Sequence, residues 1–239
     1  MEGSHHRSHR RRKKQSAGKL GLAGAATGVV GVVLVAVVIV ILRSTGSGGA
    51  KTHLPDTDGA PAVSGGVVGR VAAPRTGAPL HLTTPDGFAY NVAAARAGTN
   101  DRPLRTDTTP PPAGKTYAYI DYVLTNAHDQ KALLDFPGDL FVRRALVPAK
   151  VRARCMPQAG AAADLCTLPN HSAVIGYLHG SKAPAEENGD QYMSPGASYL
   201  VRIATTQPVE KSVGQRDLRM YVWDARYFID RRAVDVPFP

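Results

Sequence analysis

Residues 116–126 read TYAYIDYVLTN, and this stretch decides the fold class. Its side chains alternate between an apolar set and a mixed set. The apolar set is Ala118, Ile120, Tyr122 and Leu124, and the mixed set is Tyr117, Tyr119, Asp121 and Val123. Successive side chains of a strand point to opposite faces, so a period of two indicates a β-strand with one face in a core. The stretch therefore predicts a central strand of a β-rich domain.

Shorter segments with β-branched and aromatic residues lie on both sides of this stretch. They are residues 67–72, 80–83, 88–95, 140–144, 147–154, 173–179, 199–205 and 218–224. Turn signals such as Pro137-Gly138 separate most of them. After residue 43 the chain shows no long amphipathic helical period, and residues 158–165 are a weak exception. This pattern predicts an all-β domain over residues 67–239, arranged as a sandwich or barrel.

The N-terminal part has a different composition. Residues 20–42 are 23 residues long, with Thr27 as the only polar side chain. A helix of this length reaches roughly 34 Å, enough to cross a hydrocarbon core of about 30 Å. A signal peptide is the alternative, but its apolar part usually has about 7–15 residues and ends at a small-residue cleavage site. We therefore expect a retained transmembrane helix in contact with membrane lipid.

Basic residues set the expected orientation of that helix. Residues 1–19 contain seven Lys or Arg and one acidic residue, so they carry +6 of the net charge of +10. Only Arg43 and Lys51 follow within about 20 residues of the helix, and the more basic flank normally stays in the cytoplasm. We expect a cytoplasmic tail over 1–19 and an extracellular C-terminal domain on a bacterial cell membrane. This reading explains the basicity without nucleic-acid binding.

The sequence also indicates a linker after the helix and a contact between two copies of the helix. Residues 43–66 are rich in Gly, Ser, Thr, Ala and Pro, a composition typical of a flexible linker. Gly24 and Gly28 form a small-xxx-small pair inside the helix, which permits a homodimer through the membrane segment.

The chain has two cysteines, Cys155 and Cys166. The expected topology places both outside the membrane, where paired thiols oxidise. We expect a disulfide that closes one loop.

Two motifs carry a resemblance to a known family. Residues 121–127 read DYVLTNA, a strand that ends in Asn and a short polar turn, and residues 194–203 begin with SPGAS and lead into a strand. They resemble the telokin-like, immunoglobulin-like extracytoplasmic domain family of unknown function, which occurs on Gram-positive cell-surface proteins. The resemblance covers residues 88–224 and implies an immunoglobulin-like antiparallel β-sandwich without a known activity. The stretch between the cysteines departs from the family pattern.

Enzyme and metal chemistry have weaker support. A sortase-like transpeptidase needs a free thiolate beside a His and an Arg. Cys166 has His128, His171, His179 and Arg202 as possible partners, but residues 163–167 read ADLCT, where such enzymes have Thr-Leu-x-Thr-Cys. The cysteines and histidines match no compact zinc pattern. The acidic residues Glu186, Glu187 and Asp190 are typical of a solvated loop. We expect no cofactor and no catalytic or metal site.

The segment 218–224 offers the best candidate for partner binding. Leu218, Met220 and Val222 form one face, whereas Tyr221 and Trp223 lie on the other. These aromatic residues face either solvent or a covering loop, and exposed aromatic residues are frequent binding anchors. We expect a non-enzymatic binding or scaffolding module with a cell-envelope protein as its partner. The alternatives are an envelope enzyme that uses Cys166 and a small-ligand carrier.

Overall fold

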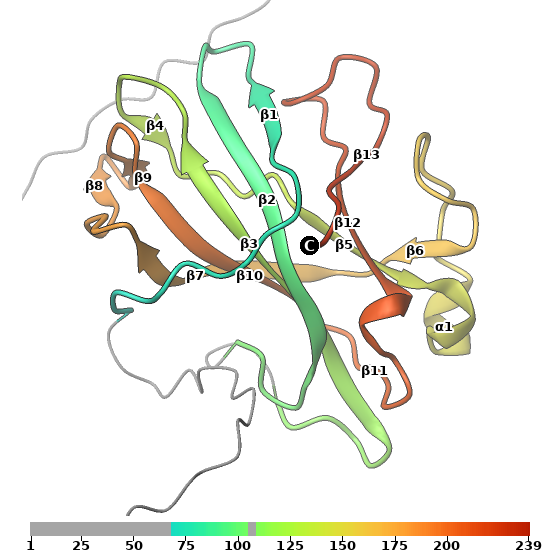
Figure 1. Ribbon diagram of the computed structural model, residues 1–239. Helices are drawn as coiled ribbons and strands as arrows, with labels where there is room; N and C mark the ends of the chain where they lie inside the picture. Colours follow the sequence, from blue (N-terminus) through green and yellow to red (C-terminus); the bar gives the residue numbers. More distant parts are fainter. Residues whose placement is uncertain (1–67, 105–108) are drawn as a thin grey trace, which may run out of the picture. The chain divides into compact units, whose positions relative to one another are not determined.

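The computed structural model describes residues 68–104 and 109–239. They form antiparallel β-sheets, so the all-β class predicted from the strand pattern is confirmed (Figure 1). The largest sheet has the order β1-β2-β3-β10-β7, and β11 also pairs with β3. Its strands are β1 (Leu80–Thr83), β2 (Ala89–Asn100), β3 (Lys115–Asn126), β7 (Asn170–Leu178), β10 (Ser198–Thr205) and β11 (Val209–Glu210).

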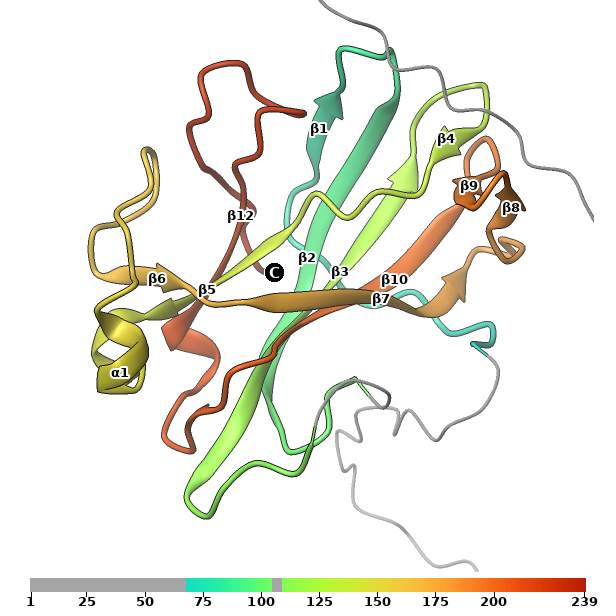
Figure 2. The same ribbon diagram turned by 180° about the vertical axis from the view of Figure 1, so that it is seen from behind.

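A second sheet has the order β13-β12-β5-β6, and a small third sheet has the order β4-β9-β8. The second sheet contains β5 (Asp139–Arg143), β6 (Leu165–Thr167), β12 (Leu218–Val222) and β13 (Val234–Asp235). The third contains β4 (Ala132–Leu133), β8 (Ala185–Glu187) and β9 (Asp190–Met193). The helical elements are α1 (Ala149–Arg152) and two 3-10 turns, Arg144–Leu146 and Gln215–Asp217. Figure 2 shows the same arrangement from behind.

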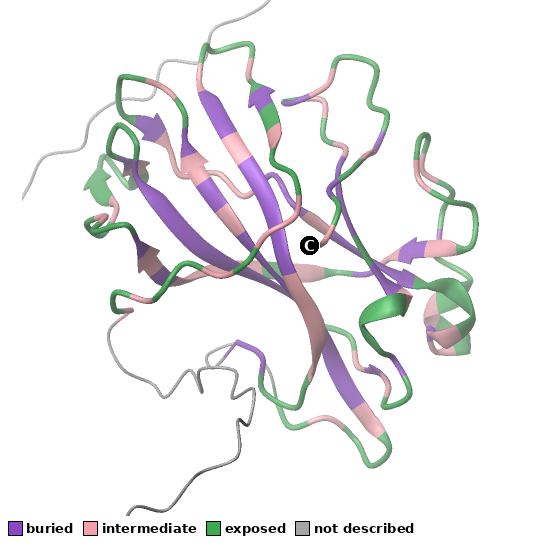
Figure 3. Ribbon diagram, in the orientation of Figure 1, coloured by how far each residue is buried: buried purple, intermediate pink, exposed green. Residues whose placement is uncertain are grey.

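One core joins the two larger sheets. The four apolar side chains of β3 that the sequence assigned to a core are all fully buried. They share one hydrophobic cluster with the inward side chains of β12, Leu218, Met220 and Val222. The predicted inward face of the segment 218–224 is thus confirmed. Figure 3 shows burial along β2, β3 and β10, with exposed residues mainly in the connecting segments.

The opposite face of β3 is also covered, which the sequence did not indicate. Tyr119 belongs to a second cluster with Leu104 and Ala204, so the segment before the undescribed residues 105–108 lies against this face. Asp121 is fully buried there and accepts hydrogen bonds from Arg202 of β10 at 2.6 and 2.9 Å. The Arg202 guanidinium also lies 4.1 Å from the centre of the Tyr119 ring. A buried ion pair therefore lies on the sheet's second face.

Asn126 joins the two sequence motifs that carried the family resemblance. Its buried side-chain amide donates hydrogen bonds to the carbonyl groups of Gln130, Met193 and Ser194 at 2.8, 3.3 and 3.1 Å. Its side-chain oxygen accepts one from the backbone of His128 at 2.9 Å. Asn126 at the end of β3 thus connects the turn that follows β3 with the turn of the SPGAS motif.

Some expected strands differ from the observed elements. Residues 147–154 contain α1 instead of a strand: Pro148 precedes the helix, where its missing N–H leaves no donor unpaired, and the Ala, Lys and Arg that follow are good helix formers. Within 68–72, only one parallel bridge forms, between Arg70 and Tyr177. Residues 158–165 form turns and the start of β6 instead of a helix.

The predicted tail, transmembrane helix and linker, residues 1–66, lie outside the described residues, so the membrane anchor stays a prediction. Within residues 68–104 and 109–239, no helix has the length and apolar character to cross a membrane.

Candidate functional site

A cleft of about 510 Å³ lies where β5 begins, β6 leads into β7 and β12 ends. It contains the candidate residue Trp223. The lining residues are Phe136–Asp139, Thr167–Asn170, Ser172, Trp223, Asp224, Arg226 and Tyr227. A volume of this size falls in the range of small-molecule sites, and the mixture of aromatic and polar side chains is typical of them.

Asp139 anchors the wall of this cleft. One of its carboxylate oxygens accepts hydrogen bonds from the indole N–H of Trp223 at 2.6 Å and the hydroxyl of Thr167 at 3.1 Å. The other oxygen accepts from its neighbour, the backbone N–H of Leu140, at 2.8 Å and from the side-chain amide of Asn170. Four donors occupy the four acceptor positions of a carboxylate. Asp139 therefore links β5, β6, β7 and the end of β12.

Burial raises the pKa of Asp139 above its ordinary value, although the hydrogen bonds from Trp223, Asn170, Leu140 and Thr167 act in the opposite direction. A raised pKa in a cleft is one mark of a general acid or base. Such a group also has to reach a substrate proton. Because every acceptor position already has a donor inside the protein, the geometry favours a structural role for this carboxylate.

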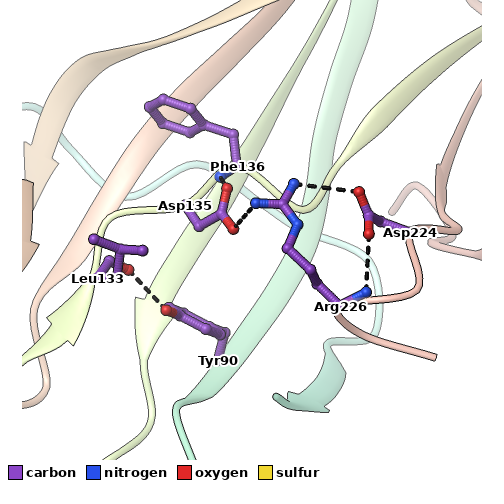
Figure 4. A network of polar contacts seen from close by, with 6 residues as sticks. All are labelled: Tyr90, Leu133, Asp135, Phe136, Asp224 and Arg226. Carbon is purple, nitrogen blue, oxygen red and sulfur yellow. Dashed lines mark hydrogen bonds and ion pairs between the residues drawn. The ribbon is translucent and has the colours of Figure 1, made fainter. Parts of the chain in front are cut away.

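Arg226 forms a second polar network at the rim of the cleft (Figure 4). Its guanidinium contacts the carboxylate of Asp135 at 2.6 Å and that of Asp224 at 3.2 Å. The backbone N–H of Arg226 also donates to Asp224 at 2.8 Å. This hydrogen bond and the Arg226 side chain hold the pKa of Asp224 below its ordinary value, although some desolvation of this exposed side chain acts in the opposite direction. The network fixes the segment after β12 against the segment between β4 and β5.

Two more clefts border Arg226. One of about 550 Å³ lies between the β1–β2 turn and residues 225–230, and one of about 390 Å³ lies against Phe88 and Tyr90. The Tyr90 hydroxyl donates to the carbonyl of Leu133 at 2.7 Å, as Figure 4 shows. Ile229 lines the larger of these two clefts and is 97% exposed. The segment after β12 therefore has open concave surface on more than one side.

The two aromatic residues of the predicted binding face have different environments. Tyr221 lies under a loop, the second of the two expected arrangements: it is buried, and its ring packs edge-on against Phe141 with ring centres 4.9 Å apart. Ala161 and Ala233 belong to the same cluster. Trp223 is half-buried and lines the 510 Å³ cleft. A role for either residue in partner binding stays a prediction, and Trp223 has the better access.

The predicted disulfide between Cys155 and Cys166 is confirmed, with Cα atoms 5.1 Å apart. Arg202, a possible partner in the sortase-like alternative, is bonded to Asp121. The acidic residues Glu186, Glu187 and Asp190 are exposed in the β8–β9 hairpin. Among the described residues, no group of three or more His, Cys, Asp or Glu side chains is placed to hold a metal ion.

The sequence did not indicate Asp139 or Arg226 as site residues. Asp139 follows the Pro137-Gly138 turn as an ordinary first residue of a strand, and Trp223 lies 84 positions away. No local spacing connects two residues so far apart.

Comparisons with family models, with curated proteins and with solved structures found no match for this chain.

Proposed function

We propose that this protein is a non-enzymatic binding module, held at the outer face of a bacterial cytoplasmic membrane by residues 20–42. The cleft beside Trp223 carries the binding role. An aromatic side chain and several polar groups line it, and its partly buried carboxylate, Asp139, is saturated by hydrogen bonds within the protein. Such a surface is suited to recognition, since its shape is held by strands from different parts of the chain. The expected partner is a protein of the cell envelope.

We also propose that the domain belongs to the immunoglobulin-like β-sandwiches and to the telokin-like extracytoplasmic family. Two antiparallel sheets share one core, as in such sandwiches. The hydrogen bond from Asn126 to Ser194 joins the two motifs that resemble this family. Loops at the end of a sandwich are frequent binding sites.

The membrane anchor leads to a direct test. A C-terminal fusion to a reporter that is active only outside the cytoplasm is expected to be active in a bacterial host. The reason is that the basic residues before position 20 keep the N-terminus inside. Reporter activity is compared with that of a matched fusion lacking residues 20–42. An inactive full-length fusion, or full-length protein in the soluble cytosolic fraction, would contradict the anchor.

Photocrosslinking in cells tests the binding role. We place a photoreactive residue at Ile229, which is almost fully exposed and lines the 550 Å³ cleft that shares Arg226 and Tyr227 with the cleft beside Trp223. The control is the exposed Gln191 on β9. A discrete protein adduct is expected from position 229 but not from 191. Trp223→Ala, with the fold verified by circular dichroism, is expected to reduce that adduct at least about tenfold if Trp223 is a hot spot. Equal adducts from both positions, or no effect of Trp223→Ala, would reject the proposal.

The volume of the 510 Å³ cleft favours a small-ligand carrier as the second candidate. In the same experiment, such a carrier would yield an adduct with a small molecule in place of a protein. The enzyme alternative has less support because Cys166 is bonded to Cys155, which leaves the chain without a free thiol nucleophile.

A further inference from the structure

The segment between β5 and β6 differs in charge from the rest of the domain. We call this segment, residues 143–166, the disulfide projection. It contains five Lys or Arg and one acidic residue, a net charge of +4. Over the whole range 68–239 the chain holds 20 basic and 16 acidic residues, also +4. The domain outside the projection is therefore neutral, and its excess positive charge lies in one tenth of the chain.

Most of these charges have no acidic partner. Arg144, Lys150 and Arg154 are exposed and form no ion pair within the described residues. Arg152 is also exposed, and its guanidinium donates hydrogen bonds to the backbone carbonyls of Ala145 and Val147 at 3.1 and 3.0 Å, which leaves its charge uncompensated. Arg143 is the exception because it pairs with Asp217 at 3.1 Å. Four positive charges thus remain free for an external anionic partner.

Local structure concentrates these charges. Lys150 lies in α1, and the following turn continues its course, since the backbone N–H groups of Arg154 and Cys155 donate to the carbonyls of Val151 and Arg152. Lys150 and Arg154 therefore lie on consecutive turns of one short helical stretch, and both are exposed. The buried Cys155 then ties the turn to Cys166 of β6.

A large apolar side chain is exposed at the same turn. Met156 follows Arg154 and Cys155 directly and is 72% exposed. The residues that follow Met156 are held in place by the segment before β13. The backbone N–H of Ala233 donates a hydrogen bond to the carbonyl oxygen of Ala159 at 2.6 Å. At Gly160 an added Cβ would lie 2.4 Å from the carbonyl oxygen of Ala233. The projection is therefore packed against the segment before β13, with Met156 left facing outward.

We infer that the disulfide projection docks on the anionic lipid surface of the membrane that carries the chain. A bilayer interface recognises this combination, because basic side chains contact the lipid headgroups while an exposed apolar side chain inserts between them. A soluble anionic polymer would match the charges but would leave Met156 in water. The inference rests on the proposed membrane anchorage, which brings the domain close to lipid.

Weak individual contacts are sufficient for a tethered domain. Each Lys or Arg close to an anionic surface strengthens binding by about fivefold. Arg144, Lys150 and Arg154 together would therefore contribute on the order of a hundredfold. The tether makes the contact intramolecular, with an effective concentration on the order of millimolar. Docking would hold the domain in one orientation, with the β8–β9 hairpin on the side opposite α1 (Figures 1 and 2).

The test uses the full chain in nanodiscs of phosphatidylcholine, with or without phosphatidylglycerol. A photoreactive residue replaces Met156, and Glu186 of the β8–β9 hairpin serves as the control position. We expect at least about fivefold more lipid adduct from position 156 than from 186 in discs with phosphatidylglycerol, and loss of this excess in 0.5 M salt, as screening demands. Equal adducts from both positions in these discs would overturn the inference.

A charge series completes the test. The combined change Arg144→Gln, Lys150→Gln and Arg154→Gln is expected to reduce the adduct at position 156 to the control level. The matched change Arg75→Gln, Arg102→Gln and Lys182→Gln removes three exposed charges elsewhere and is expected to leave it unchanged. An equal response to both triple changes would overturn the inference.

Failure of the anchor has a separate signature. A chain that does not co-elute with the discs contradicts the anchorage itself. Docking is then measured by sedimentation of the same chain with vesicles. Pelleting that depends on phosphatidylglycerol and on the three basic residues supports the docking surface. Pelleting that depends on neither would overturn the inference.

Discussion

Arg202→Met is expected to lower the free energy of unfolding by about 3–5 kcal/mol, one of the two largest effects we predict. Asp121 is fully buried, and its carboxylate accepts two charge-assisted hydrogen bonds from the Arg202 guanidinium. Burial opposes the charge of Arg202, but the hydrogen bond and the negative charge of Asp121 raise the pKa of Arg202 above its ordinary value. Without this arginine, the carboxylate keeps only Arg96, which contacts it at 2.7 Å.

The control is the double change Asp121→Leu with Arg202→Met. It removes both charges and leaves apolar side chains beside Tyr119 and Ala204, so the loss is expected to be at least about 2 kcal/mol smaller than that of Arg202→Met alone. Urea unfolding of the full chain in detergent, followed by far-ultraviolet circular dichroism, measures both. A double variant as unstable as the single variant would show that the side-chain volume of Arg202, not its charge, stabilises the sheet.

This ion pair illustrates what the sequence could have shown. Asp121 and Arg202 each lie at the centre of an apolar strand, where a charge without a partner would be too costly. Two opposite charges in such positions indicate adjacent strands, and β3 and β10 do pair with these two residues opposite each other. The alternation in β3 was sufficient to predict its buried face. It did not predict the second covered face, because the residues that cover it belong to a loop without a pattern.

Other features show the limits of local patterns. Two features followed from short-range signals. Turn residues indicated the strand at residues 80–83, and the presence of two nearby thiols indicated the disulfide. The strand predicted at 147–154 was wrong because Pro148 favours a helix start and the Ala, Lys and Arg that follow are good helix formers, which outweighed the alternation. The site around Asp139 depends on contacts between β5, β6, β7 and β12. The spacing of residues within each segment does not predict which of these strands lie together.

The second large effect is expected for Asp139→Ala, a loss of about 3 kcal/mol in the free energy of unfolding. The change leaves the N–H groups of Trp223, Asn170 and Leu140 and the hydroxyl of Thr167 without their acceptor. Each buried donor without a partner costs about 1–3 kcal/mol, and water from the adjacent cleft offsets part of the total.

Asp224→Ala serves as the control for this prediction, since it removes another carboxylate of the same cleft. Asp224 is exposed, so its loss is expected to cost less than about 1 kcal/mol. Urea unfolding measured by circular dichroism compares the two variants, and the fluorescence of Trp223, the only tryptophan of the chain, reports on the cleft. A red-shifted emission in Asp139→Ala but not in Asp224→Ala is expected, because only the first change releases the indole. Equal stabilities and equal spectra would show that Asp139 does not hold the cleft wall, and the binding surface would then lack its main support.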